Sequence, residues 1–517
     1  MSLKAFAQKW LILLHRWLGI GFCLLFIVWF ASGIVMMYAR MPRLTNEERL
    51  IRLENLDFRA AKLSPNEAFA KLNETEIPTT VRLGMFNGRP IYRFQIKQLW
   101  KTVFADSGEV LNAISADNSV IIAKSFYPEH AEKIAFLQTL EDADQWTLSS
   151  AIRRLKPLHQ LALNDEAGSQ IYVSSQTGEV VLKTDSRGRF WGYVGAVLHW
   201  IYFTPLKKHS EVWNWTIVII SFIGSLMCLM GIVIGLWRFS MSKRFQRKTS
   251  HTPYRGDKRL HHWLGMIFGL FTFTWILSGM FSMNPFDWSP SKSPSKEHLE
   301  VVRGGKFDLA KFQVPPLKAQ QIYADSFKIK ELELSQFRGK PYYFAVETPQ
   351  VLVDTNWSNT DFAGYLASET KMRQMFLNAE TGETLTEFAP EIFEKIAVEA
   401  MPNAKIIEQT WLKEYDNYYY AQKNDGKNLP VLRVKYDDEK STWLYFDPQL
   451  GKIALKHESL SRVERWLYQG LHSLDFPMFY QSRPLWDIIL ILLSSGGIWL
   501  SWTAVKLSWV RVKGRKS

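Results

Sequence analysis

The chain is poor in cysteine, because only Cys23 and Cys228 occur among its 517 residues. Both lie in long apolar stretches, so the sequence contains no disulfide framework, no Cys-x-x-Cys iron–sulfur pattern and no Cys-x-x-Cys-His haem attachment. A Gly-x-Gly-x-x-Gly fingerprint after a strand and a P-loop are also missing. No Gly-x-Ser-x-Gly elbow is present either. These absences exclude the common sequence-encoded sites for nucleotides, flavins and serine nucleophiles.

Acidic residues are almost absent from three segments: the first 16 residues, residues 238–259 and residues 506–517. Together these segments carry sixteen lysines and arginines against Asp257 alone. The net charge of the whole chain is +13, so the remainder carries a slight negative charge. The basic excess is therefore typical of the positive-inside rule and does not indicate a nucleic-acid surface. It predicts that both termini and the middle segment face the cytoplasm.

Long uncharged apolar runs explain that charge pattern. Each is near the length of about 20 residues that a helix needs to cross a bilayer. The runs cover residues 17–37, 212–237, 263–286 and 488–505. The mean hydropathy of −0.13 implies that most of the chain lies outside the membrane. We read the first run as a retained span, because it is long for a signal peptide and no clear cleavage site follows it.

These runs define the expected order of segments. Residues 1–40 form the N-terminus and first span, and 41–186 form an external domain. Residues 187–238 form an interfacial helix and the second span, followed by a basic loop at 239–259. The third span (260–286), a second external domain (287–460), an interfacial helix with the fourth span (461–509) and a tail (510–517) complete the chain.

The chain is an internal repeat. Leu-His-Arg-Trp-Leu-Gly at 14–19 recurs as Leu-His-His-Trp-Leu-Gly at 260–265. At the same offset of 246, Trp29, Ser32 and Gly33 correspond to Trp275, Ser278 and Gly279. At an offset of 273, His199, Trp213, Ser221 and Gly224 correspond to His472, Trp486, Ser494 and Gly497. Two pairs of equivalent histidines therefore lie beside predicted spans.

The external segments contain a second repeated pattern, a strand-like run followed by a glycine turn and another apolar run. The turn glycines are Gly108, Gly178, Gly382 and Gly451. Glycine there suits a hairpin that requires positive φ. Residues 64–72 predict a capped amphipathic helix, and residues 92–96 alternate as a half-buried strand.

A helix followed by a hairpin sheet resembles the PepSY module. With the Leu-His-x-Trp-Leu-Gly openings and the Thr-Gly-Glu turns, the chain resembles the PepSY-associated transmembrane family, of the iron-regulated membrane protein type. The resemblance covers nearly the whole chain and implies a four-helix transmembrane bundle with α+β PepSY-like periplasmic domains. It also implies similarity to di-haem inner-membrane reductases of ferric siderophores.

The positions of the histidines limit how they can be combined. His15 and His261 lie at the cytoplasmic ends of their spans, whereas His199 and His472 lie outside, each 14 residues before a tryptophan that opens a span. The hydrocarbon core is about 30 Å thick, so His15 and His199 cannot share one metal. Parallel repeats place equivalent residues face to face. We therefore predict that His15 and His261 ligate one b-type haem, and His199 and His472 another.

Other residues near these histidines have two interpretations each. Gly19 and Gly33, with Gly265 and Gly279, lie near the histidine face; they either admit a flat macrocycle or allow close helix packing. His262 competes with His261 as a ligand, but its counterpart is Arg16, which cannot ligate iron. Arg16 and His262 are instead candidates for pairing with haem propionates.

The remaining histidines carry weaker expectations. His159 has no repeat partner and is assigned a surface or structural role, while His130, His209, His251, His298 and His457 are expected at the surface. A structural zinc site fits less well than haem, because zinc needs more ligands than two histidines. The aromatic residues around His199, among them Trp200 and Tyr202, are typical of an interfacial belt. Alternatively, some of them line a substrate cleft.

The expected function is an electron conduit in the inner membrane of a bacterium. A cytoplasmic or quinol donor supplies electrons, and the resemblance implies that a periplasmic ferric siderophore accepts them. The alternative is a non-enzymatic envelope protein whose PepSY modules dock or regulate other proteins. No nucleic-acid partner is expected.

Overall fold

The computed structural model describes residues 3–239, 251–349, 372–420, 427–480, 482 and 484–514. The chain divides into two compact units. The helical unit comprises Met1–Met41, Arg187–Pro290 and Leu460–Ser517, and the sheet unit comprises Pro42–Ser186 and Ser291–Ser459. The basic loop predicted at 239–259 lies mostly outside the described residues.

Four long helices dominate the helical unit: α1 (Leu3–Met36), α8 (Ser210–Arg238), α9 (Gly256–Ser282) and α17 (Leu485–Val512). All four are long and apolar enough to cross a membrane, which confirms the four predicted spans. The third helix ends earlier than the sequence predicts, at Ser282 and not at residue 286. Asn284 and Phe286 adopt left-handed backbone conformations there, with φ of 49° and 58°, which ends the helix.

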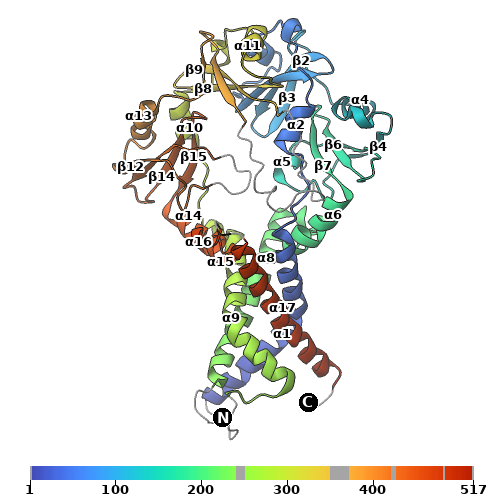
Figure 1. Ribbon diagram of the computed structural model, residues 1–517, viewed down its shortest axis with the longest axis vertical. Helices are drawn as coiled ribbons and strands as arrows, with labels where there is room; N and C mark the ends of the chain where they lie inside the picture. Colours follow the sequence, from blue (N-terminus) through green and yellow to red (C-terminus); the bar gives the residue numbers. More distant parts are fainter. Residues whose placement is uncertain are drawn as a thin grey trace. The chain divides into compact units, whose positions relative to one another are not determined.

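The four helices form a closed ring in the order α1, α8, α9, α17, each packing against two neighbours (Figure 1). The centre of the ring is apolar and aromatic, with Phe26, Phe30, Trp275 and Ile276 buried in one cluster. In this order α1 and α9 lie diagonally opposite each other. This arrangement matters because one pair of equivalent histidines lies on these two helices, and the other pair is hydrogen-bonded to them.

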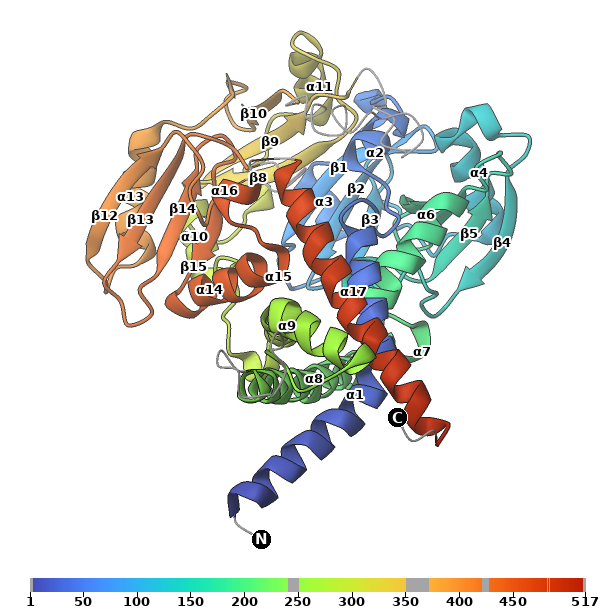
Figure 2. The ribbon, with the colours of Figure 1, turned by 60° about the horizontal axis from the view of Figure 1, so that its bottom comes forward.

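Shorter helical segments precede α8 and α17 (Figure 2). In the first half of the chain, α6 (Ser186–Gly192) continues into a π-helical turn at Tyr193–Val197. In the second half, α14 (Ser459–Glu464) continues into a π-helical turn at Arg465–Gly470, which is followed by α15 (Leu471–Ser473). Each π-helical turn ends two residues before a histidine, His199 or His472. Such turns are frequent at functional sites.

The sheet unit is built around one seven-stranded antiparallel sheet to which both external segments contribute. Its order is β11-β10-β9-β8-β1-β2-β3. The strands are β1 (Thr80–Phe86), β2 (Arg89–Ile96), β3 (Leu99–Phe104), β8 (Leu332–Phe337), β9 (Lys340–Val346), β10 (Gln374–Asn378) and β11 (Thr384–Leu385). β1 pairs with β8 through Val81–Leu334, Arg82–Glu333 and Leu83–Leu332. The two segments, each of which the sequence treats as a domain with its own core, therefore share a sheet and a core.

Short helices cover this sheet. In the first segment, α3 (Pro65–Ala70) buries Ala68 on it, and in the second α11 (Pro316–Ala324) buries Ala319 and Tyr323. The helix predicted from residue 64 is present and begins with a capping box between Ser64 and Glu67.

Each segment adds a four-stranded antiparallel sheet. The first is β4 (Ala135–Leu140), β5 (Leu158–Ala162), β6 (Gln170–Ser174) and β7 (Val180–Thr184), packed against α4 (Ala116–Phe126). The second is β12 (Ile406–Leu412), β13 (Val431–Tyr436), β14 (Trp443–Asp447) and β15 (Lys452–His457). The helix α13 (Pro390–Ala400) packs on the second sheet through Phe393 and Ile396.

The four turn glycines all adopt positive φ, between 58° and 81°. Gly178 and Gly451 connect β6 to β7 and β14 to β15, and Gly382 connects β10 to β11. The prediction that these positions require glycine because of their backbone conformation is confirmed.

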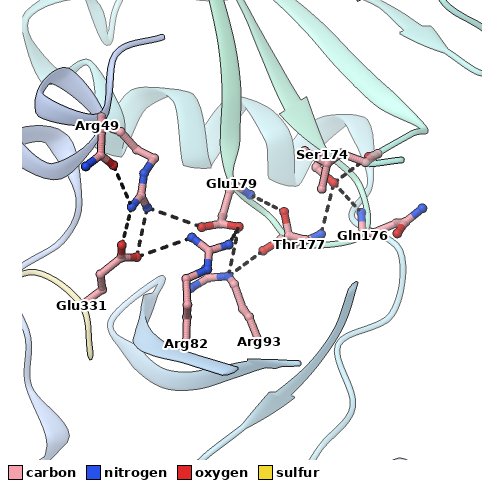
Figure 3. Close-up of polar contacts among 10 residues, drawn as sticks. Arg49, Arg82, Arg93, Ser174, Gln176, Thr177, Glu179 and Glu331 are labelled. Carbon is pink, nitrogen blue, oxygen red and sulfur yellow. Dashed lines mark hydrogen bonds and ion pairs between the residues drawn. The ribbon is translucent and has the colours of Figure 1, made fainter. Parts of the chain in front are cut away.

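A buried ionic network joins the two segments where β1 meets β8 (Figure 3). Glu331, one residue before β8, accepts two hydrogen bonds from Arg49, one of them at 3.0 Å. Glu179 accepts a hydrogen bond from Arg82 at 2.9 Å and lies 3.7 Å from the Arg93 guanidinium. The network ties the two halves of the sheet together, because its charged residues come from both segments. Removing any one of them would leave a buried partner without its opposite charge.

Stability of the sheet unit is expected to fall in acid because of Glu179. Burial alone would raise the pKa of Glu179, but Arg82, Arg93 and Arg49 outweigh burial and lower that pKa to about 2. The folded-state pKa lies below the unfolded value, so the stabilisation is present above about pH 4.5 and is lost as pH falls toward 2. Its size is on the order of 3 kcal/mol. Chemical unfolding of the full chain, measured between pH 3 and 7, should show this loss.

The Glu179→Gln variant should unfold more easily at neutral pH and show a shallower acid dependence. Glu47 is an exposed residue of α2 (Asn46–Arg52) and provides the control. Glu47→Gln should keep the wild-type dependence. Identical pH profiles for wild type and Glu179→Gln would refute this assignment.

Candidate cofactor site

The helical unit brings the four repeated histidines together as two pairs. Pair one is His15 on α1 with His261 on α9, and the centroids of their imidazole rings are 6.4 Å apart. Pair two is His199 with His472, at a centroid separation of 6.0 Å. These are the two combinations that the repeat predicts, and no mixed combination is formed in the described residues.

Both separations match what a shared metal ion requires. A metal–imidazole nitrogen bond is about 2 Å long and the ring centre lies about 1 Å further out, so two imidazoles on opposite sides of one ion have centroids about 6 Å apart. The rings are inclined by 44° in pair one and 71° in pair two. Rotation about the metal–nitrogen bond allows any such angle. Each pair therefore has the spacing of two axial ligands.

In pair one, each imidazole is hydrogen-bonded through Nδ1 to the next helix of the ring. His15 Nδ1 lies 3.0 Å from the Met227 carbonyl oxygen on α8. His261 Nδ1 lies 2.8 Å from Thr503 Oγ1 on α17, and that hydroxyl donates to the Leu500 carbonyl oxygen. Met227 and Leu500 are equivalent at the offset of 273, so both imidazoles are directed to the same region of the neighbouring helix.

In pair two, the corresponding contacts are made to α1 and α9. His199 Nδ1 lies 3.1 Å from the Trp29 carbonyl oxygen and 3.2 Å from Ser32 Oγ. His472 Nδ1 lies 3.0 Å from the Trp275 carbonyl oxygen and 3.2 Å from Ser278 Oγ. The acceptors are equivalent at the offset of 246.

A backbone carbonyl can only accept a hydrogen bond, so Nδ1 must carry the proton in His15, His199 and His472. His261 has the same tautomer, because the Thr503 hydroxyl gives its proton to the Leu500 carbonyl and can only accept from the ring. Nε2 then presents a lone pair, and none of the four Nε2 atoms has a hydrogen bond within the part of the chain that the structure describes. A metal-binding histidine typically has this arrangement, with its second nitrogen donating to a carbonyl. The donor set of two imidazoles per site fits an axially ligated haem.

The glycines divide into two groups. A Cβ added at Gly33 would lie 3.5 Å from His199 Cε1, and one at Gly279 would lie 3.3 Å from His472 Cε1. These two glycines therefore contact pair two, although the sequence places them on the face of pair one. A Cβ at Gly19 would meet nothing within 4 Å, and one at Gly265 would meet only Leu500, at 3.9 Å. Open space is thus present beside pair one.

One further glycine was not anticipated. A Cβ at Gly231 on α8 would lie 2.7 Å from His15 Cε1. The equivalent position at the offset of 273 is Ala504, so the requirement for glycine applies to the first half alone.

His262 is not available as a ligand. Its Nδ1 lies 2.7 Å from Thr252 Oγ1 and its Nε2 lies 3.0 Å from the Gly235 carbonyl oxygen. Both nitrogens are used in a buried environment, so the structure favours His261 over His262. Both nitrogens are therefore already hydrogen-bonded, and pairing of Arg16 or His262 with haem propionates stays a prediction. Arg16 is exposed on α1.

Three other histidines are structural. His159 on β5 is buried between Thr139 Oγ1 at 2.9 Å and the Ile114 carbonyl oxygen at 2.7 Å. His298 and His457 are also buried, so the expectation that they lie at the surface is wrong. His298 closes the capping box at the start of α10 (Lys296–Arg303), and His457 packs beside Tyr418 on the last strand.

Aromatic residues beside His199 form an exposed cluster. Trp200 is 39% exposed, and Tyr202 packs between Trp200 and Trp213 with ring centroids 5.8 and 5.6 Å away. Lys207 Nζ lies 3.4 Å from the centre of the Trp213 ring. Such a cluster is typical of the membrane interface.

The residues missed by sequence reasoning are the partners of Nδ1. The repeat makes Ser32 and Ser278 equivalent but assigns them no role, and it does not single out Thr503. Backbone carbonyls at positions 29, 227, 275 and 500 carry no signal in a sequence. A serine or threonine follows three of these carbonyls by three residues, and Met230 follows the fourth.

A sequence model described as the PepSY-associated TM region matches residues 12–511. No protein of established function matches the chain significantly.

Proposed function

Because the chain belongs to the PepSY-associated transmembrane family and holds two histidine pairs at metal-sharing distance, we propose that it binds two b-type haems and conducts electrons across the membrane to a ferric siderophore. The observation that carries this proposal is the recurrence of one ligand geometry in both pairs. Each pair has centroids about 6 Å apart, as two axial imidazoles require, and each Nδ1 is bonded to a neighbouring segment.

The chain's own residues hold, orient and protect the proposed ligands. His15 and His261 would hold one haem, and His199 and His472 the other; bound haem would supply reversible one-electron transfer. The neighbouring helices fix each imidazole through Nδ1, and Gly33, Gly231 and Gly279 allow the backbone to approach the rings. The apolar centre of the bundle excludes water between the two pairs.

The proposed location is the inner membrane of a bacterium. The basic residues at the start of α1, between the apolar parts of α8 and α9, and from the end of α17 onward favour a cytoplasmic location for these ends by the positive-inside rule. Pair one then lies on the cytoplasmic side, where a cytoplasmic or quinol donor would supply electrons, and pair two lies on the periplasmic side.

One electron delivered to the periplasm reduces Fe(III) in the chelate to Fe(II). The siderophore binds Fe(II) poorly, so the reduction releases the metal. The step transfers one electron and needs no proton-transfer residue.

The absorption spectrum of the purified full-length chain tests the proposal. Dithionite should produce the sharp α band of a low-spin b-type haem, with two haems per chain. A colourless protein would exclude the proposal.

The acceptor is tested separately. Pre-reduced protein should be reoxidised by a ferric hydroxamate, with Fe(II) trapped by a ferrous chelator, and the corresponding gallium complex should not react. Trp200→Ala or Tyr202→Ala should slow reoxidation without loss of haem if the exposed cluster beside His199 contacts the chelate. Reoxidation by oxygen or quinone with no response to any ferric chelate would indicate another oxidoreductase.

Orientation gives an independent prediction. Reporters fused after Lys248 or Ser517 should be active only in the cytoplasm, because the basic segments remain there. Reporters inserted within residues 60–180 or 300–450 should be active only in the periplasm. A periplasmic C-terminus would contradict the parallel arrangement of the halves.

A further inference from the structure

The carbonyls that face the imidazoles share a local pattern. In three of the four contacts, the residue three positions after the carbonyl is a serine or threonine whose hydroxyl donates back to the same carbonyl. Ser32 Oγ lies 3.1 Å from the Trp29 oxygen, Ser278 Oγ lies 3.1 Å from the Trp275 oxygen, and Thr503 Oγ1 lies 2.7 Å from the Leu500 oxygen. All three hydroxyl-bearing residues are almost completely buried, at 2% exposure.

Each of these hydroxyls also contacts a ring nitrogen. The distances from Oγ to Nδ1 are 3.2 Å for His199, 3.2 Å for His472 and 2.8 Å for His261. A hydroxyl has one proton, which the carbonyl takes here, so a lone pair faces the ring. Only a ring protonated at Nδ1 can donate to that lone pair.

The fourth contact lacks this hydroxyl. His15 Nδ1 faces the Met227 carbonyl, and the residue three positions later is Met230. Met230 occupies the position equivalent to Thr503 at the offset of 273. His15 is therefore held by a carbonyl alone, whereas each of the other three histidines faces a buried hydroxyl.

Serines and threonines in membrane helices often bond to a carbonyl of the preceding turn without any further role. This chain contains such cases. Ser225 bonds to the Ser221 oxygen, and Ser501 bonds to the Gly497 oxygen at 2.8 Å. Ser501 is buried on α17 two residues before Thr503, yet no imidazole contact is found for it in the described residues. It provides a matched control.

We propose that Ser32, Ser278 and Thr503 are positioning residues that lock the Nδ1–H tautomer of their histidines and aim Nε2 at the metal. Met230 leaves His15 as the least constrained of the four ligands. The expected effect of these residues on metal binding rests on the proposed function, whereas their effect on the tautomer is a property of the protein itself. Outer-shell partners of this kind typically contribute about ten- to a hundredfold in metal affinity.

The test on the loaded protein measures how readily an imidazole leaves the iron. Carbon monoxide binds reduced haem only when an axial ligand is displaced. Ser32→Ala or Ser278→Ala should accelerate carbon monoxide binding up to about tenfold at pair two alone. Thr503→Val should accelerate it at pair one alone and by only about twofold, because the loosely held His15 already provides one route there. Ser501→Ala should leave both rates unchanged.

Met230→Thr should change the rate of carbon monoxide binding in the opposite direction. Because the rate should fall and not rise, damage to the protein cannot explain the result. The substitution supplies the missing hydroxyl, so carbon monoxide binding at pair one should become slower than in the wild type. Equal rates in Thr503→Val, Ser501→Ala and wild type, or faster binding in Met230→Thr, would overturn the proposal.

The tautomer is measured without reference to the iron. Nitrogen-15 shifts of labelled histidine in the full-length chain should show His261 protonated at Nδ1, with an increased Nε2-protonated fraction in Thr503→Val. A protein without haem would refute the proposed function while this measurement still decides the role of the hydroxyl. The measurement is made on haem-free protein, because iron bound at Nε2 fixes the proton on Nδ1. An unchanged tautomer in haem-free Thr503→Val would refute the positioning role.

Discussion

Replacing His199 with alanine is expected to remove one haem and leave the other, and His472→Ala should have the same result. His15→Ala and His261→Ala should each remove the remaining haem. The reason is that each pair supplies both axial ligands of one site, with ring centroids 6.0 or 6.4 Å apart. Haem-to-protein ratios and low-temperature reduced spectra of the four variants would resolve the two sites, and each variant should lose transmembrane reduction completely.

Two other histidines serve as controls for this experiment. His262 and His159 have both ring nitrogens bonded within the protein. Alanine at either position should preserve two haems per chain, although His159→Ala should lower the stability of the sheet unit. The pairing would be wrong if His15→Ala and His261→Ala depleted different haems.

Gly178→Ala is expected to destabilise the sheet unit by about 2–4 kcal/mol, which combines the cost of a non-glycine residue at positive φ with overpacking. The φ of Gly178 is 67°, and a Cβ there would overlap Phe86 and lie 2.8 Å from Ile114 Cδ1. Both neighbours belong to the core beneath β6 and β7. Thermal unfolding of the full-length chain, followed by circular dichroism in the β-sheet region, would measure the loss.

Gly88→Ala separates the two causes. Gly88 has a similar φ of 72°, but a Cβ there meets nothing within 4 Å. This variant should therefore incur only the backbone cost, on the order of 1 kcal/mol. Equal losses in Gly88→Ala and Gly178→Ala would show that the contact with Phe86 does not matter.

Local signals in the sequence were sufficient to predict individual helices and turns. Uncharged runs predicted the four spans, because a bilayer imposes length and composition on any helix that crosses it. The turn glycines predicted positive φ, and Ser64 predicted the start of α3, because these features depend on a few neighbouring residues.

Contacts between distant segments left no such signal. The pairing of β1 with β8 joins residues about 250 positions apart, and a strand sequence does not specify its neighbour. The end of α9 at Ser282 depends on left-handed backbone conformations at Asn284 and Phe286, and at Phe286 this conformation is unusual for the residue type. The burial of His298 and His457 reflects tertiary packing, which propensity does not encode.

For the candidate site, the internal repeat carried most of the information. It predicted which histidines would be combined, because equivalent residues face each other across the axis of a parallel repeat. It could not predict that Gly33 and Gly279 contact pair two, since this depends on where the segments carrying His199 and His472 return to α1 and α9.

The sheet shared by both segments has a consequence for biogenesis. Strand β1 is synthesised long before β8, and the spans α8 and α9 must be inserted between them. At typical rates of translation, β1 waits on the order of tens of seconds for its neighbour. During this interval Val81 and Leu83 lie on an open sheet edge, a hazard for aggregation. We therefore expect the first half expressed alone to be recovered as aggregate, because its strand β1 never meets β8.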